Sequence, residues 1–248
     1  MSVGNVTRPV EIALVYQSLL GIYGDQGNAK VLMKRLQWRG IEAKLTVVEP
    51  GDPVPPSATV YLLGGGEDNA QVSAVRELKK DGNLFRGLDD GAVLFAVCAG
   101  YQICGNTFTI GDNDEVIEGL GVLDVDTRRA PERAVGELLS AWTRPDGTES
   151  LMTGFENHGG YTTVGPNARP LGRVQIGVGN ADDGTEGAVQ GKVIATYPHG
   201  PVLARNADLA DYVLETALER KLEPLDRPEI DELHRQRVDF VRRQGLRR

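Results

Sequence analysis

A cysteine at the end of an apolar run is the first residue whose type and position could do chemistry. Residues 92–97 are apolar and typical of a buried strand, and small residues suited to opening a helix follow Cys98. A strand-to-helix turn of this kind presents a reactive side chain at the edge of a sheet. A core cysteine that simply ends a strand is the alternative, but Ala99 and Gly100 are small enough for a crowded turn and favour a nucleophile.

A histidine much later in the chain is placed to act as the base for this thiol. Residues 194–197 form another apolar run, which leads to His199 and Gly200. A thiol and an imidazole at two strand ends are what a Cys-His acyl-transfer enzyme requires, which predicts an amide-cleaving thiol hydrolase. His199 would take the thiol proton and return it to the leaving ammonia. His158 is the rival base, with a structural role in a loop as its alternative.

Attack of a thiolate on a carboxamide creates an oxyanion that needs preorganised N–H donors. The backbone N–H of Ala99, directly after the nucleophile, is expected to be one donor. The other donors are expected from Gly65 and Gly66, in the loop that follows the apolar run 60–63. A flexible turn is the alternative, and a phosphate loop is disfavoured because no Gly-Lys-Ser/Thr follows.

The composition is that of an ordinary globular enzyme. Of the 248 residues, 25% are charged and 40% are hydrophobic, which is ordinary for a globular protein. The net charge of −8 argues against a surface that binds nucleic acid. No run approaches the length of a membrane span, and residues 1–9 lack the apolar core of a signal peptide. The two cysteines, Cys98 and Cys104, fit a reducing, cytoplasmic compartment and exclude a Cys-rich metal framework. We expect Cys104 to be a buried small hydrophobe.

Apolar runs alternate with amphipathic segments in the first half of the chain. Strands are expected at residues 11–16, 45–48, 60–63 and 92–97, and helices at about 29–36 and 70–80. This alternation predicts an α/β fold, with a doubly wound, mostly parallel sheet flanked by helices. From about residue 111 to 196, short β-prone runs among Gly, Asn and Asp predict antiparallel strands and loops.

The end of the chain differs from the rest in composition. We expect one domain over residues 1–220 and a charged helical extension over 221–248, which is rich in arginine. A solvated helix is the simplest interpretation of the extension. A docking arm for a partner protein is the alternative.

Taken in order, these motifs resemble class I glutamine amidotransferases over about residues 10–220. That family commonly has a glutamate two residues after the histidine, where this chain has Pro201, so the chain is more similar to the cobyric-acid-synthase-like branch. Within that branch it resembles the glutaminase subunits of bacterial lipid II isoglutaminyl synthases. The segments that carry the resemblance are residues 23–28, 63–68, 98–102, 155–160, 177–180, 183–187 and 196–201.

The resemblance implies an activity and a partner. L-Glutamine would be hydrolysed through a thioester on Cys98, without a cofactor or metal. The ammonia would pass to a MurT-like, ATP-dependent Mur ligase subunit in a heterodimer, which amidates the D-glutamate α-carboxyl of lipid II in peptidoglycan synthesis. An amidotransferase subunit for another acceptor, such as a cobyrinate-type substrate, and a catalytically silent scaffold are the alternatives.

The resemblance also implies residues that bind substrate. An arginine after the elbow helix would bind the glutamine, and Arg133 is our choice, with Arg128 and Arg129 as competitors and a surface salt bridge as the alternative role. Gln102 is implied as a second substrate-binding residue. The acid that orients the histidine would come from the ligase subunit in trans or from Glu156.

Overall fold

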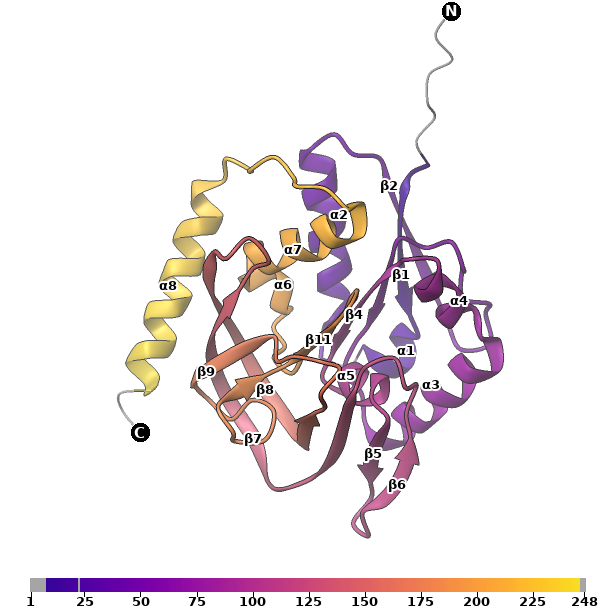
Figure 1. Ribbon diagram of the computed structural model, residues 1–248. Helices are drawn as coiled ribbons and strands as arrows, with labels where there is room; N and C mark the ends of the chain where they lie inside the picture. The colour runs from indigo at the N-terminus through magenta and orange to yellow at the C-terminus, as the bar shows by residue number, and fades with distance from the viewer. Residues whose placement is uncertain (1–7, 22, 246–248) are drawn as a thin grey trace, which may run out of the picture.

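The computed structural model describes residues 8–21 and 23–245, which form two six-stranded sheets with helices around the first (Figure 1). The first sheet has the order β11-β12-β4-β3-β1-β2. In that order its strands are Ala188–Gln190, Val193–Thr196, Val93–Val97, Val60–Leu63, Val10–Val15 and Ala43–Val48.

All neighbouring pairs in the first sheet are parallel except β11 with β12. Every residue of β1, β3, β4 and β12 is buried, as expected for apolar strands covered on both faces. Helices α2, α6 and α7 pack on one face, and α1, α3, α4 and α5 lie on the other (Figure 1). The expected doubly wound α/β fold is therefore confirmed.

The helices around the sheet have ends that their sequences explain. In α3, Asp68 lies in the first turn and lysines in the last, where each complements the helix dipole. Gly82 ends α3 in the left-handed region, with φ 70°. The helices from α1 to α7 are Gln17–Leu20, Gln26–Trp38, Asp68–Asp81, Asn83–Asp89, Ala99–Cys104, Val202–Arg205 and Ala207–Leu218.

The second sheet is built around a long antiparallel ribbon, β7 paired with β8. The sequence predicted antiparallel strands here, but these two strands span 19 and 16 residues and are far longer than the short runs expected. The register of the ribbon shifts between Arg129 and Ala134. The strands β5 to β10 are Thr107–Ile110, Glu115–Glu118, Val125–Thr143, Glu149–Val164, Gly172–Ile176 and Thr185–Glu186.

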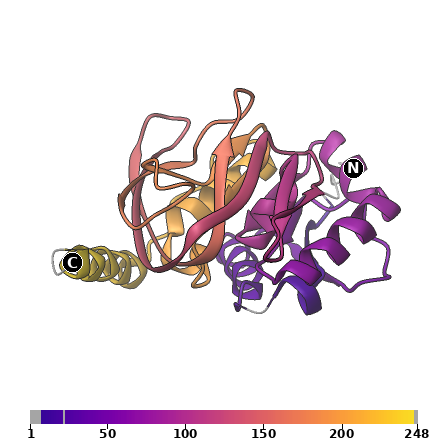
Figure 2. The same cartoon turned by 90° about the horizontal axis from the view of Figure 1, so that it is seen from below.

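The C-terminal segment forms a helix, α8 (Pro228–Gly245), that folds back on the outer side of this ribbon (Figures 1 and 2). Val238 and Val241 are buried against Leu139, so α8 is not solvated on all sides. The boundary at residue 220 lies just after α7, and the division into two domains stays a prediction. Over the described residues, none of the helices combines the length and the apolar character needed to cross a membrane.

Candidate active site

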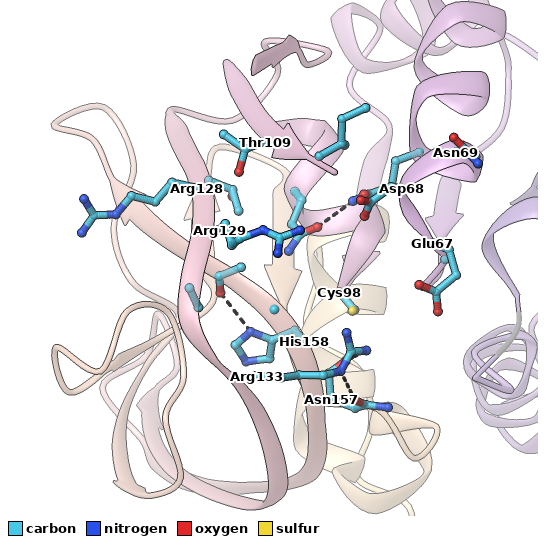
Figure 3. Close-up of a pocket in the computed structure, with 18 of the residues that line it drawn as sticks. Glu67, Asp68, Asn69, Cys98, Thr109, Arg128, Arg129, Arg133, Asn157 and His158 are labelled. Carbon is cyan, nitrogen blue, oxygen red and sulfur yellow. Dashed lines mark hydrogen bonds between the residues drawn. The ribbon is translucent and has the colours of Figure 1, made fainter. Parts of the chain in front are cut away.

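The parallel sheet brings three segments of the predicted site to one edge. Because β3, β4 and β12 run parallel, the glycine loop at 64–66, Cys98 and His199 all follow the carboxyl ends of their strands. Ligands of open α/β sheets bind in the crevice at this edge. Cys98, Gly66 and parts of the β7–β8 ribbon line a cavity of about 510 Å³ there (Figure 3).

Cys98 stands in a strained turn between β4 and α5, as the sequence predicted. Its φ of 53° and ψ of −108° lie outside the regions that non-glycine residues favour. The backbone N–H of Cys98 donates to Thr196 O at 2.9 Å, and that of Gly100 donates to Gly64 O at 3.0 Å. A Cβ at Gly100 would lie 2.8 Å from Leu63 O, so the helix can begin this close to β3 only with glycine.

His199 is paired with a carboxylate that sequence reasoning missed, Asp25. The imidazole Nδ1 lies 3.2 Å from Asp25 Oδ1 and 3.1 Å from Oδ2, and both side chains are almost fully buried. Two backbone hydrogen bonds with Phe155, of 2.9 and 3.1 Å, hold the His199 backbone against β8. His199 is therefore fixed by both sheets, and Asp25 sets the orientation of its ring.

The surroundings of His199 favour the charged imidazolium. Burial alone would lower the pKa of His199, but the hydrogen bond to Asp25 and the interactions with Cys98 outweigh it and raise the pKa from 6.5 to about 10. Nε2, the other ring nitrogen, makes no hydrogen bond with any described residue. The imidazolium therefore places a positive charge beside Cys98.

The glycine loop approaches the histidine more closely than its sequence alone indicates. The Gly65 N–H donates to Asp25 Oδ2 at 2.9 Å, and a Cβ at Gly65 would lie 2.7 Å from His199 Cε1. This corrects the expectation that Gly65 is an oxyanion donor, because its N–H is already engaged. The N–H groups of Gly66 and Ala99 have no hydrogen-bond partner among the described residues and stay the expected donors.

Arg133 and Gln102 both line the cavity beside Cys98. Arg133 Nε donates to Asn157 Oδ1 at 2.8 Å, which holds its guanidinium near Cys98 (Figure 3). The Oε1 atom of Gln102 accepts a hydrogen bond of 2.6 Å from Nε2 of Gln71 on α3, which fixes the Gln102 side chain.

The two competing arginines also line the cavity but differ in their surroundings. Arg129 pairs with Asp112 and Asp114 at 3.1 and 3.3 Å, so its charge is largely neutralised. Arg128 points away from Cys98 (Figure 3). Of the three arginines, Arg133 is therefore the one that lies near Cys98 without a carboxylate partner in the described residues, and its role in substrate binding stays a prediction.

Glu156 does not face His199, which corrects its assignment as the acid. Its carboxylate accepts the N–H groups of Val178 and Gly179 at 2.8 and 3.0 Å, and one oxygen lies 3.6 Å from His158 Nε2. His158 is in strand β8 rather than in a loop. Its Nδ1 lies 3.0 Å from a backbone carbonyl and its ring stacks on a tyrosine, so it is held as part of the cavity wall.

At one edge of the parallel sheet the site therefore combines a cysteine in a strained turn, a carboxylate-bound imidazole and backbone N–H groups around one cavity. A family model described as a CobB/CobQ-like glutamine amidotransferase domain matches residues 11–207. The chain belongs to this family of glutamine amidotransferases.

Two relatives have the same name, lipid II isoglutaminyl synthase (glutamine-hydrolyzing) subunit GatD. The one from Staphylococcus aureus is 35% identical, over 86% of this chain and 86% of that protein. The one from Streptococcus pneumoniae is 31% identical, over 88% of this chain and 84% of that protein. A crystal structure of a glutamine amidotransferase, 23% identical, matches 83% of this chain and 98% of that chain with a TM-score of 0.56, which supports the fold.

Proposed function

We propose that this protein hydrolyses L-glutamine to glutamate and ammonia through a thioester on Cys98. The observation that carries the proposal is the buried contact of 3.1 Å between Asp25 and the imidazole of His199, beside a cysteine in a strained turn. A carboxylate, an imidazole and a thiol in this order are the parts of a nucleophilic hydrolase, whatever their order in the sequence.

The proposed reaction has two halves. The Cys98 thiolate attacks the carboxamide carbon, and the N–H groups of Ala99 and Gly66 stabilise the oxyanion. The His199 imidazolium gives its proton to the leaving nitrogen, so ammonia departs and a γ-glutamyl thioester remains. His199 then takes a proton from water, which attacks the thioester and releases glutamate. Asp25 stabilises the imidazolium in both halves.

We propose further that the ammonia serves a ligase partner, as the shared name of the two relatives suggests. That partner is a MurT-like Mur ligase subunit that amidates the D-glutamate of lipid II, in the cytoplasm, where two free thiols persist. The family description also covers CobB and CobQ-type domains, so a cobyrinate-type acceptor is the alternative. Copurification of the chain with its ligase, followed by mass analysis of the amidated stem peptide, distinguishes the two acceptors.

The glutaminase step is tested with the two cysteines. Cys98→Ala should abolish ammonia release from L-glutamine by the chain with its ligase partner, while the thermal unfolding temperature is kept. Cys104→Ala is the matched control, because Cys104 is fully buried and its burial raises the pKa of the thiol. It should keep the wild-type turnover per folded molecule. Ammonia release by the Cys98 variant at the wild-type rate would contradict the mechanism, and no release by the wild type would favour the scaffold.

A further inference from the structure

We propose that Glu67 binds the α-ammonium group of the glutamine substrate, opposite an arginine that takes the α-carboxylate. This inference rests on the proposed glutaminase activity and adds to it the means by which the site selects an α-amino acid. Glu67 directly follows the glycine loop, as the residue before α3, and lines the same cavity as Cys98.

The carboxylate of Glu67 is held in place by Tyr23. The Tyr23 hydroxyl donates to Glu67 Oε1 at 3.0 Å, and the Tyr23 ring packs on the His199 ring with centroids 4.6 Å apart. Burial and the hydrogen bond to Glu67 raise the pKa of Tyr23, so the hydroxyl remains a donor. Glu67 is therefore fixed relative to the proposed base, although its side chain is open to solvent.

Within the part of the chain that the structure describes, Glu67 carries the carboxylate of the cavity wall that no cation or backbone N–H engages. The second carboxylate that lines the cavity, that of Asp68, accepts the Gly111 N–H at 2.8 Å and so contacts the turn of the β5–β6 hairpin. Two further carboxylates are buried and already have partners. Asp25 contacts the His199 imidazole and accepts a backbone N–H, and Glu156 accepts two backbone N–H groups.

A matching positive charge lies across the cavity. Arg133 bonds to the neutral side chain of Asn157, and within residues 8–21 and 23–245 no ion pair joins Arg133 to a carboxylate. Figure 3 shows Glu67 and Arg133 on different sides of Cys98. Among the three arginines and two carboxylates that line the cavity, Arg133 and Glu67 are therefore the pair that lies beside Cys98 without an ion-pair partner in the described residues.

This pair of charges fits a zwitterion. When the carboxamide of L-glutamine is at Cys98, its α-ammonium and α-carboxylate leave the same carbon and diverge toward the rim of the cavity. A guanidinium alone would accept any ω-amide of a dicarboxylic acid, whereas a carboxylate beside it adds attraction only for an ammonium group. Glu67 therefore gives selectivity for an α-amino acid amide.

The test compares two substrates that differ by the ammonium group, L-glutamine and glutaramic acid, in the chain with its ligase partner. Glu67→Gln keeps the side-chain length and an oxygen for Tyr23. It should raise the KM for L-glutamine about tenfold, leave kcat unchanged and leave the KM for glutaramic acid unchanged. Asp68→Asn is the control, because it removes the same charge one residue away and should not change the ratio of the two KM values.

An unchanged ratio of KM values in Glu67→Gln would overturn the inference, as would an equal loss in Asp68→Asn. The failure of the proposed function looks different, because the wild type would then release no ammonia from either compound. In that case calorimetric titration of L-glutamine into the wild type and Glu67→Gln decides the role of Glu67 independently. Equal dissociation constants would refute it.

Discussion

Replacement of Asp25 by asparagine exchanges one oxygen for nitrogen and tests the carboxylate–imidazole pair directly. The rise in the pKa of His199 from 6.5 to about 10 corresponds to about 5 kcal/mol in favour of the imidazolium. Asp25 and Cys98 share this stabilisation. Because the hydrogen bond to Asp25 is the largest of the contributions that raise this pKa, we assign about half of the stabilisation to it, which is ~2 to 3 kcal/mol, or on the order of 60-fold in kcat/KM.

The hydrogen bonds around Asp25 make the substitution worse than a simple loss of charge. The Gly65 N–H requires an oxygen at the position of Oδ2, 2.9 Å away. The amide nitrogen of the introduced asparagine is then left at the position of Oδ1, 3.2 Å from His199 Nδ1, where it opposes a protonated ring nitrogen. The expected loss therefore lies between about 60-fold and the ~10⁴-fold seen for the same change in a Ser-His-Asp triad.

The assay is ammonia release from L-glutamine across pH, by the wild type and the variant with the ligase partner. The alkaline limb of kcat/KM should fall near pH 10 in the wild type and move toward neutral pH in Asp25→Asn. Glu156→Gln is the control, because it alters the other buried carboxylate–imidazole pair and should leave kcat and this limb in place. A kcat/KM within about threefold of wild type, with the same limb, would refute the role of Asp25.

The same shift links folding to pH. Because the folded-state pKa of His199 is raised above 6.5, its stabilising contribution is complete below pH 6.5 and is lost as pH rises through about 10. The thermal unfolding temperature of the wild type should therefore fall more steeply than that of Asp25→Asn over this interval. Parallel curves for the two proteins would show that Asp25 does not stabilise the imidazolium.

Two other substitutions test the packing around the site. Gly65→Ala places a Cβ 2.7 Å from His199 Cε1, so kcat should fall about 10²-fold through displacement of the imidazole, and a wild-type kcat would contradict this contact. Asp211→Ala leaves Arg35 and Arg39 without the carboxylate that pairs them at 2.6 and 2.8 Å between α2 and α7. It should cost about 3 kcal/mol, or roughly 6–12 °C in Tm by calorimetry, with kcat per folded molecule unchanged, whereas a Tm within about 2 °C of wild type would refute it.

The sequence could predict that Cys98, His199 and the glycine loop lie at one sheet edge, because each follows an apolar run that is buried in full, whereas their chemical roles stay predictions. Strand ends in a parallel sheet meet at one edge, so position along the chain was enough. Asp25 could not be found in this way, since it lies 174 residues before His199 in a loop that no strand end marks. The feature that could have indicated Asp25 is its position between Gly24 and Gly27, in a segment to which the sequence analysis assigned no chemical role.

Glu156 was misassigned for a reason that strand geometry explains. Residues two apart in a strand point to the same face, so Glu156 pairs with His158 rather than with His199. The long ribbon was also missed, because Pro131 and the irregular register at 129–134 interrupt the alternation that identifies a strand. The extent of the second sheet therefore depends on the pairing of β7 with β8, which the pattern of apolar and polar residues along the sequence does not indicate.

The irregular register of the ribbon has an evolutionary consequence. Cys98 and His199 follow strands of the parallel sheet, whereas Arg133 lies on β7 inside the irregular stretch between Arg129 and Ala134. An irregular stretch tolerates insertion and replacement better than a buried parallel strand. The proposed donor-binding residue Arg133 can therefore diverge while the proposed nucleophile and base stay intact, and a library confined to residues 129–134 is the natural starting point for changing the amide donor.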